Sequence, residues 1–381
     1  IISTLLLPLM VQAFSCLVAW VISLISSKMR NKNIITMVVS LLFLAAYFYL
    51  YSKMGDIISG LIANGTAIAV AFKKYAFPAY YFGVGIAEHN LTYLLLYTVC
   101  TLAVFELVYA ILSRSFRQIT TAKKGTARIK YKERSMHVSS PAAALLRKDF
   151  RHFIGNPMYV LNAWMGEILL VVACVAMLIK KDILTEFLPI LNGEGEIMGL
   201  ILCVILCGLS CTNLITAPSI SLEGKNLWIA QSIPVPAATV LRAKVKLQML
   251  LCIPITALSA LLMGIVLKLE LLTLVLAVLV PAAFNLFTAL LGVVVNLHFP
   301  KFDYINETVV IKQSMSTMIC MFGSMAVVLV LALLYALLLS ASVAPTLFLA
   351  VCLVLLVIVC VLMWRYLGHG GSARFAALQA D

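Results

Sequence analysis

Long uncharged apolar stretches recur along the chain, and shorter segments that hold most of the polar residues separate them. A helix needs about 20 apolar residues to cross the hydrocarbon core of a bilayer. Such stretches are expected to be helical, because lipid offers no hydrogen-bond partners to an open backbone. The pattern predicts an all-α polytopic membrane protein with about nine transmembrane helices. Their approximate ranges are 4–26, 34–52, 91–112, 158–179, 197–217, 249–267, 271–296, 314–339 and 346–366.

The gaps between these spans alternate in charge. Placing alternate gaps on opposite sides of a membrane puts 22 of the 28 Lys and Arg residues on one side and 6 on the other. Segment 113–157 alone carries eleven basic residues and two acidic ones. Short loops that remain in the cytoplasm keep an excess of positive charge. The charge pattern therefore predicts that segment 113–157 and the C-terminus are cytoplasmic.

Composition agrees with this interpretation. Hydrophobic residues make up 63% of the chain, charged residues 11%, and the mean hydropathy is +1.08, which excludes an ordinary soluble domain. The net charge of +13 could indicate nucleic-acid binding. However, aromatic stacking partners are nearly absent from the basic connector 113–140. We therefore expect the lipid bilayer as a partner and no nucleic acid.

Segment 53–90 is too apolar for a solvated loop but is interrupted by Gly, Asn, Pro and the pair Lys73-Lys74. Each of its two apolar runs is short for a span. We predict two re-entrant external helices that dip into the outer leaflet. The alternative is that one run crosses the membrane, which would invert the topology upstream.

Residues 141–154 predict an amphipathic helix lying in the headgroup plane, ended by Gly155-Asn156-Pro157. One face is apolar and the other is basic. The apolar positions are Leu146, Phe150, Phe153 and Ile154, and the basic ones are Arg147, Lys148, Arg151 and His152.

A second polar segment, 218–248, contains a short predicted helix over 223–233 that Pro234 ends. The centre of this short helix is unusually apolar for a loop exposed to the cytoplasm. Two interpretations remain open: the helix docks in a groove of a soluble subunit and carries force, or Trp228 anchors an interfacial loop at headgroup depth. The candidate coupling residues are Glu223, Gly224, Lys225, Asn226, Leu227, Trp228 and Ile229.

These segments resemble a known family. The run Leu-Leu-Arg-Lys-Asp-Phe-Arg-His-Phe-Ile-Gly-Asn-Pro, then Ser-Leu-Glu-Gly-Lys-Asn-Leu-Trp and Ile-Pro-Val-Pro, is similar to ABC-2-type exporter permeases of bacteria. The resemblance is strongest over 141–320. It implies a six-span half at 141–381 with elbow 141–154 and coupling segment 218–248. Residues 1–112 would be the last three spans of a preceding half, whose first part we expect to be missing before Ile1.

The resemblance also implies a function. The chain would be the permease subunit of an exporter in the cytoplasmic membrane of a bacterium, moving a peptide, a lipid-like molecule or a drug. No G-x-x-x-x-G-K-[ST] loop occurs in the sequence. We therefore expect a chain without a nucleotide-binding domain, which binds no cofactor itself. Two copies of an ATP-binding cassette ATPase subunit would supply ATP and Mg²⁺.

Among the polar residues within predicted spans, five are candidate polar sites: Glu106, Glu167, Asn162, Asn213 and Asn285. An ionisable group in a span is a functional candidate. The alternative function is accordingly an ion-coupled secondary transporter that uses Glu106 and Glu167. The carboxylates could equally bond to neighbouring helices, and the asparagines are expected to join helices.

A membrane-embedded enzyme is a third class, which the absence of a clustered His/Glu set disfavours. Cys203, Cys207 and Cys211 share one helix face, a spacing that could suggest a metal. All ten cysteines lie in apolar stretches, so we interpret them as packing residues. We expect no metal and no catalytic residue.

Overall fold

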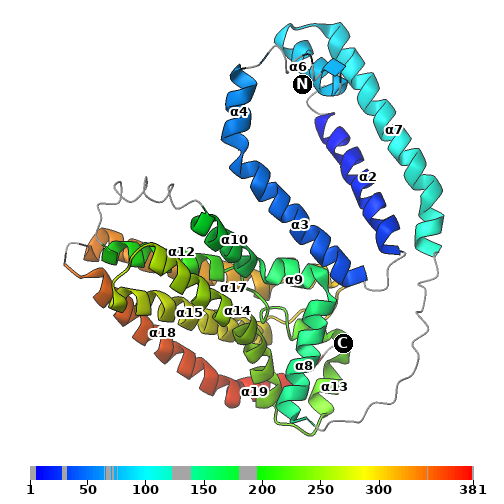
Figure 1. The fold of residues 1–381 in the computed structure, drawn as a ribbon. Coiled ribbons are helices and arrows are strands. Elements are labelled where there is room, and N and C mark those ends of the chain that lie inside the picture. The colour runs from blue at the N-terminus through cyan, green and yellow to red at the C-terminus, as the bar shows by residue number, and fades with distance from the viewer. Residues whose placement is uncertain are drawn as a thin grey trace. The chain divides into compact units, whose positions relative to one another are not determined.

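A computed structural model describes the backbone of residues 6–27, 32–63, 65, 70, 73–74, 76–121, 139–179, 195–340 and 342–379. These residues are almost entirely helical (Figure 1). The described part of the chain holds no β-strand, and its strand-like pairing is an isolated bridge between Trp164 and Asn213. The chain divides into two compact units, unit 1 (Ile1–Arg134) and unit 2 (Ser135–Asp381).

Unit 1 consists of apolar helices that cover one another only in part. α6 and α2 pack against α7, and α4 follows α3 after a bend of 50°. α4 and α6 lie in the region predicted to dip into the outer leaflet, and their depth in a membrane stays a prediction. Most of the basic connector, residues 122–138, lies outside the described residues. The helices of unit 1 are α2 (Leu7–Ser27), α3 (Lys32–Ser52), α4 (Met54–Ala63), α6 (Phe77–Ala87) and α7 (Leu91–Thr121).

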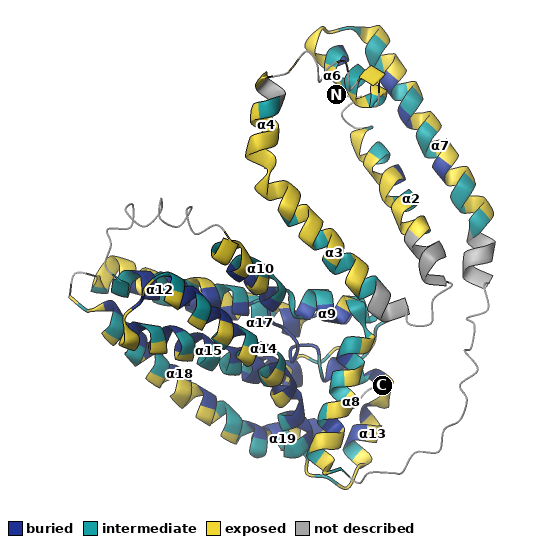
Figure 2. Ribbon diagram, in the orientation of Figure 1, coloured by how far each residue is buried: buried dark blue, intermediate teal, exposed yellow. Residues whose placement is uncertain are grey.

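Unit 2 contains most of the buried residues, as Figure 2 shows. Its elements are α8 (Pro141–Gly155), α9 (Pro157–Ala163), α10 (Met165–Ile179), α12 (Gly195–Ser210), η2 (Ser221–Asn226), α13 (Leu227–Ser232), α14 (Ala237–Val266), α15 (Leu271–His298), α16 (Glu307–Gln313), α17 (Met315–Leu334), η3 (Tyr335–Leu339), α18 (Pro345–Gly368) and α19 (Gly370–Ala377).

Local sequence fixes where the first helices of unit 2 begin. The Ser140 hydroxyl accepts a hydrogen bond from the Ala143 amide, and Pro141 starts α8. The Asn156 side chain accepts bonds from the amides of Met158 and Tyr159 at the start of α9. A side-chain acceptor before the first turn and a proline at its first position are typical helix starts. The predicted break at Gly155-Asn156-Pro157 is therefore present.

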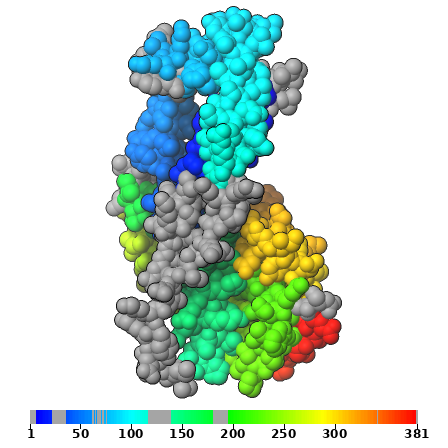
Figure 3. All heavy atoms as spheres, turned by 90° about the vertical axis from the view of Figure 1, so that its right-hand side faces the viewer, coloured from blue at the N-terminus to red at the C-terminus, as the bar shows by residue number. Residues whose placement is uncertain are grey.

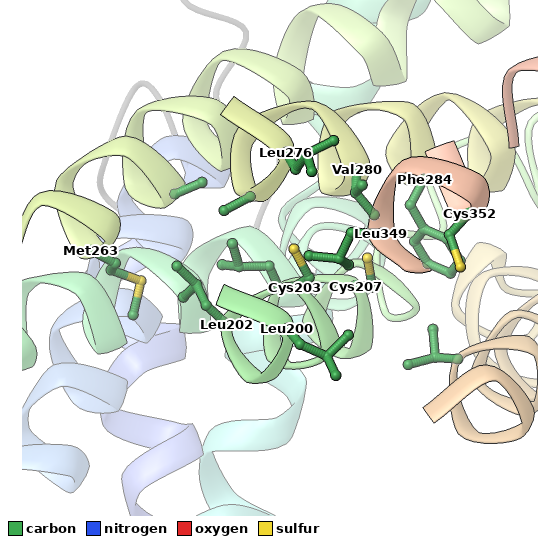
Figure 4. Packing of buried hydrophobic residues seen from close by; sticks show 14 of the residues in the cluster. Leu200, Leu202, Cys203, Cys207, Met263, Leu276, Val280, Phe284, Leu349 and Cys352 are labelled. Carbon is green, nitrogen blue, oxygen red and sulfur yellow. The ribbon is translucent and has the colours of Figure 1, made fainter. Parts of the chain in front are cut away.

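The core of unit 2 is built around α15, which packs against α12, α14, α17 and α18. Its buried face meets leucines and cysteines of α12 and residues of α18 (Figure 4). Cys203, Cys207 and Cys211 are buried, and all three belong to this apolar cluster as small packing side chains. Nothing in the described residues groups three His, Cys, Asp or Glu side chains in an arrangement that could hold a metal ion.

The prediction of nine spans is not confirmed. Within the described residues, five helices are long and apolar enough to cross a membrane, or six if α3 and α4 form one bent span. Predicted span 158–179 is divided at Trp164, where α9 ends and α10 begins. Predicted span 197–217 ends as a helix at Ser210. The sequence predicted both spans as continuous because the residues at the breaks are mostly apolar, so the mean hydropathy stays high across them.

Candidate functional site

The first part of the predicted coupling segment, 218–248, is held in place by buried polar contacts. The Asn296 side-chain oxygen of α15 accepts hydrogen bonds from the amides of Ile220 and Ser221, at 2.8 and 3.1 Å. Its nitrogen donates to the hydroxyls of Ser221 at 2.7 Å and Ser316 at 3.1 Å. Asn296 is fully buried, so all these bonds are shielded from water. They join the start of the segment to the central helix of unit 2.

Gly224 gives the segment its sharp turn. Its φ is +53°, a conformation that residues with a side chain rarely adopt. A Cβ placed there would lie 2.9 Å from the hydroxyl oxygen of Tyr304. That hydroxyl donates a hydrogen bond to the carbonyl of Leu222 at 3.2 Å. Glycine thus allows the turn and leaves room for Tyr304.

Beside this turn, four charged side chains form a neutral cluster. The Lys148 Nζ of α8 lies 2.7 and 2.8 Å from the two carboxylate oxygens of Glu223. The Lys244 Nζ of α14 lies 2.7 Å from Glu223 and 3.6 Å from Asp149. Lys244 is 3% exposed, so its charge depends on these two carboxylates for compensation. The cluster joins three elements that are distant in the sequence.

The electrostatics of Glu223 follow from this arrangement. Burial by itself would raise the pKa of the Glu223 carboxyl, but the ammonium groups of Lys244 and Lys148 outweigh burial and lower the pKa to about 2. Glu223 is therefore a carboxylate throughout the physiological pH range.

The following short helix, α13, presents an apolar surface. Leu227 is buried beneath it, whereas Trp228 is 63% exposed and Ile229 is 46% exposed. Gln231 donates hydrogen bonds to the carbonyls of Phe375 and Leu378, at 2.8 and 2.9 Å. α13 and the C-terminal α19 accordingly lie next to each other (Figure 3, bright green and red). Two exposed apolar side chains thus stand on a segment fixed at both ends.

The predicted elbow helix is α8, which packs on α14. Phe153 is buried and Leu146 and Phe150 are partly buried, whereas Arg147, Lys148 and Arg151 are exposed. The apolar and basic sides expected from the sequence are thus present. The basic side has a further role, because Lys148 reaches across to Glu223.

A second polar cluster lies inside the apolar core. The Glu167 Oε1 of α10 accepts hydrogen bonds from Asn213 at 2.9 Å and Thr256 at 2.7 Å. Asn285 of α15 donates to Thr256 at 2.9 Å and to Ser210 at 3.0 Å. All five side chains are buried, and Glu167 Oε2 has no partner. The cluster joins α10, α12, α14 and α15.

Two of the five intramembrane candidates lie elsewhere. Glu106 is on α7 of unit 1 and is exposed on that unit. Asn162 donates to the carbonyl of Met158 within its own helix, at 2.6 Å. Glu167, Asn213 and Asn285 are therefore the candidates that the structure brings together.

Several side chains that complete these contacts were not predicted from the sequence. They are Asp149 and Lys244 of the charged cluster, Ser210 and Thr256 of the buried polar cluster, and Asn296, which bonds to Ser221. The position of Lys244 could have been anticipated from helix length. α14 has 30 residues and is about 45 Å long, longer than a bilayer core of about 30 Å. Its first turns therefore extend beyond the core and can hold a lysine.

One protein-family model, described as a putative ATP-binding cassette, matches residues 2–364. No curated protein and no solved structure gives a significant match. The family match overturns the resemblance to ABC-2-type exporter permeases. It also overturns the predicted function as an exporter's permease subunit, together with the ion-coupled alternative.

The prediction that the chain lacks a nucleotide-binding domain is wrong for the same reason, because the matching family is described by ATP binding. Each error has a physical cause. Apolar spans and a basic amphipathic helix follow from the demands of a bilayer, so they do not distinguish one membrane family from another. A missing Walker A sequence excludes one phosphate-binding loop and does not decide family membership.

Proposed function

We propose that this chain, which belongs to the putative ATP-binding cassette family, is a component of an ATP-binding cassette transporter. In this proposal a nucleotide-binding cassette domain seats on the surface formed by Trp228 and Ile229. The proposal rests on one observation above all. Two large apolar side chains are exposed on a segment that buried polar contacts hold rigidly to the helices of unit 2.

Rigid attachment matters because a surface can transmit force only if it does not yield. Movement of α13 would reach α15 through the bonds of Asn296 to Ser221. It would reach α14 and α8 through Lys244 and Lys148, both bound to Glu223. Packed helices respond to such a displacement by shifting as rigid bodies.

ATP and Mg²⁺ have a defined place in the proposal. They are held by the cassette domain, whose closure around nucleotide changes its contact with α13. Participation of two cassette domains is part of the same proposal. In the proposal the segment is on the cytoplasmic side, as the charge pattern of the sequence predicts.

Site-specific crosslinking tests this function. A photoreactive phenylalanine analogue replaces Trp228 in the membrane-bound chain, and crosslinked peptides are identified by mass spectrometry with and without ATP, Mg²⁺ and vanadate. We expect a crosslink to a peptide from a cassette domain that carries a Walker A loop. The yield should change several-fold when vanadate traps the nucleotide-bound state.

Trp228→Phe serves as the matched control for Trp228→Asp in a second measurement, the Mg-ATP hydrolysis that co-purifies with the chain. Phenylalanine keeps an aromatic surface, so hydrolysis should be retained, whereas an aspartate desolvated in the contact should abolish coupling. Crosslinking to lipid alone, unaffected by nucleotide, would show instead that Trp228 is a headgroup anchor and would overturn the proposal.

A further inference from the structure

A second apolar surface of unit 2 lies between α15 and α18. It is a groove open to the outside, with a cavity volume of about 260 Å³. Its walls are Ala283, Leu286 and Leu290 of α15, with Val357, Cys360, Val361, Trp364 and Arg365 of α18.

The groove is apolar along its length and basic at one end. Trp364 and Arg365 lie in the last turns of α18, where the helix approaches its end at Gly368. The guanidinium carbon of Arg242, from α14, lies 5.0 Å from the centroid of the Trp364 ring. Arg365 therefore lines the groove where α18 finishes, and a second cation, Arg242, lies against the Trp364 ring of the same wall.

Neither arginine is neutralised by a neighbouring carboxylate. Within the described residues, no salt bridge involves Arg242 or Arg365, and the buried Nε of Arg242 has no hydrogen-bond partner. The sequence explains this charge, because positions 224–269 and 308–380 contain no Asp or Glu.

We propose that this groove binds an anionic phospholipid, with one acyl chain between α15 and α18 and the phosphate at Arg242 and Arg365. An acyl chain suits the groove because all its walls except Arg365 are apolar or aromatic. A phosphate suits its end because guanidinium groups bind phosphate oxygens through paired, charge-assisted hydrogen bonds. Phosphatidylglycerol carries a net negative charge and phosphatidylcholine does not, so charge complementarity selects the former.

Tryptophan fluorescence offers a direct test. The chain has four tryptophans, Trp20, Trp164, Trp228 and Trp364. Replacing the first three by phenylalanine leaves Trp364 as the reporter in the groove. The protein is placed in phosphatidylcholine bilayers that contain a small fraction of lipid with brominated acyl chains, either phosphatidylglycerol or phosphatidylcholine. Bromine quenches only the indole that it contacts.

We expect brominated phosphatidylglycerol to quench Trp364 at a much lower fraction than brominated phosphatidylcholine. A basic residue near an anionic surface contributes about 1 kcal/mol, so Arg365→Gln should weaken the preference about fivefold. Arg242→Gln should weaken it by a similar factor. Lys312→Gln removes an exposed positive charge outside the groove and should leave the preference unchanged. Ala283→Phe should reduce quenching to the bulk level by filling the groove.

Other results would overturn the proposal. Equal quenching by the two brominated lipids would show that the groove does not select an anionic headgroup. A preference retained at full strength in Arg365→Gln would also overturn the proposal. Loss of the preference in excess inorganic phosphate would show that the arginines bind the free anion rather than a lipid.

Discussion

Lys148 of α8 and Glu223 of η2, 75 residues apart in the chain, form an ion pair in which one ammonium nitrogen contacts both carboxylate oxygens, at 2.7 and 2.8 Å. The contact joins the amphipathic helix to the segment that bears Trp228. Lys244 binds the same carboxylate from α14. The orientation of the surface segment is therefore set by three elements together.

The two lysines should differ sharply in their effect on stability. Lys244→Met removes a charge that is 3% exposed and leaves two largely buried carboxylates with less compensation, at a cost of about 3–5 kcal/mol. Lys148→Met alters a side chain that is 48% exposed and should cost less than about 1 kcal/mol. Denaturant unfolding of the purified protein in detergent compares the two. Equal losses would contradict the burial argument.

Glu223 should give stability a particular acid dependence. Its pKa of about 2 lies below the unfolded value of about 4.3, so its contribution is fully present above the unfolded pKa. The contribution is lost as pH falls from about 4.3 towards 2, and it amounts to roughly 3 kcal/mol. Thermal unfolding of wild type and Glu223→Gln, followed from pH 7 to pH 2.5, checks this. The difference between them should be constant above pH 5 and shrink below about pH 4.

Gly224→Ala should be destabilising by at least 1–2 kcal/mol, because it forces an alanine to a φ of +53° and places its Cβ against Tyr304. Gly155→Ala is the matched control, since a Cβ there meets nothing within 4 Å. Thermal unfolding measures both. A tolerated Gly224→Ala would mean that the turn can relax, which would weaken its role in orienting α13.

Thr256 and Thr273 allow a paired test of the buried polar cluster. Both are fully buried, but the Thr256 hydroxyl donates to Glu167 and accepts from Asn285, whereas the Thr273 hydroxyl has no partner. Thr256→Val should therefore cost about 1–3 kcal/mol, and Thr273→Val should be neutral or slightly stabilising. Unfolding in mixed detergent micelles gives both values. A similar change at the two sites would show that the cluster adds little to stability.

The sequence predicted those features that depend on local periodicity. The helix at 141–155 could be anticipated because its apolar and basic positions separate on a helical projection and Pro157 follows its end. The exposed apolar pair at 228–229 could be anticipated because tryptophan and isoleucine lie in a short apolar run within a polar segment.

Contacts between distant segments could not be predicted in the same way. Lys244 meets Asp149 only because α8 packs on α14, and no local pattern encodes that packing. Asn296 was an ordinary polar residue in an apolar run until folding placed Ser221 and Ser316 beside it. The break at Trp164 was hidden because its apolar neighbours keep hydropathy high. The local sequence pattern therefore gave wrong or missing predictions where contacts between distant segments determine the structure.

The two hydrogen bonds from Gln231 to the backbone of Phe375 and Leu378 couple the position of α13 to the last residues of the chain. Any displacement of α13 must either move these two carbonyl groups or break the hydrogen bonds. A fluorophore attached at Gln379 would consequently report events at Trp228, although about 150 residues separate the two positions along the polypeptide.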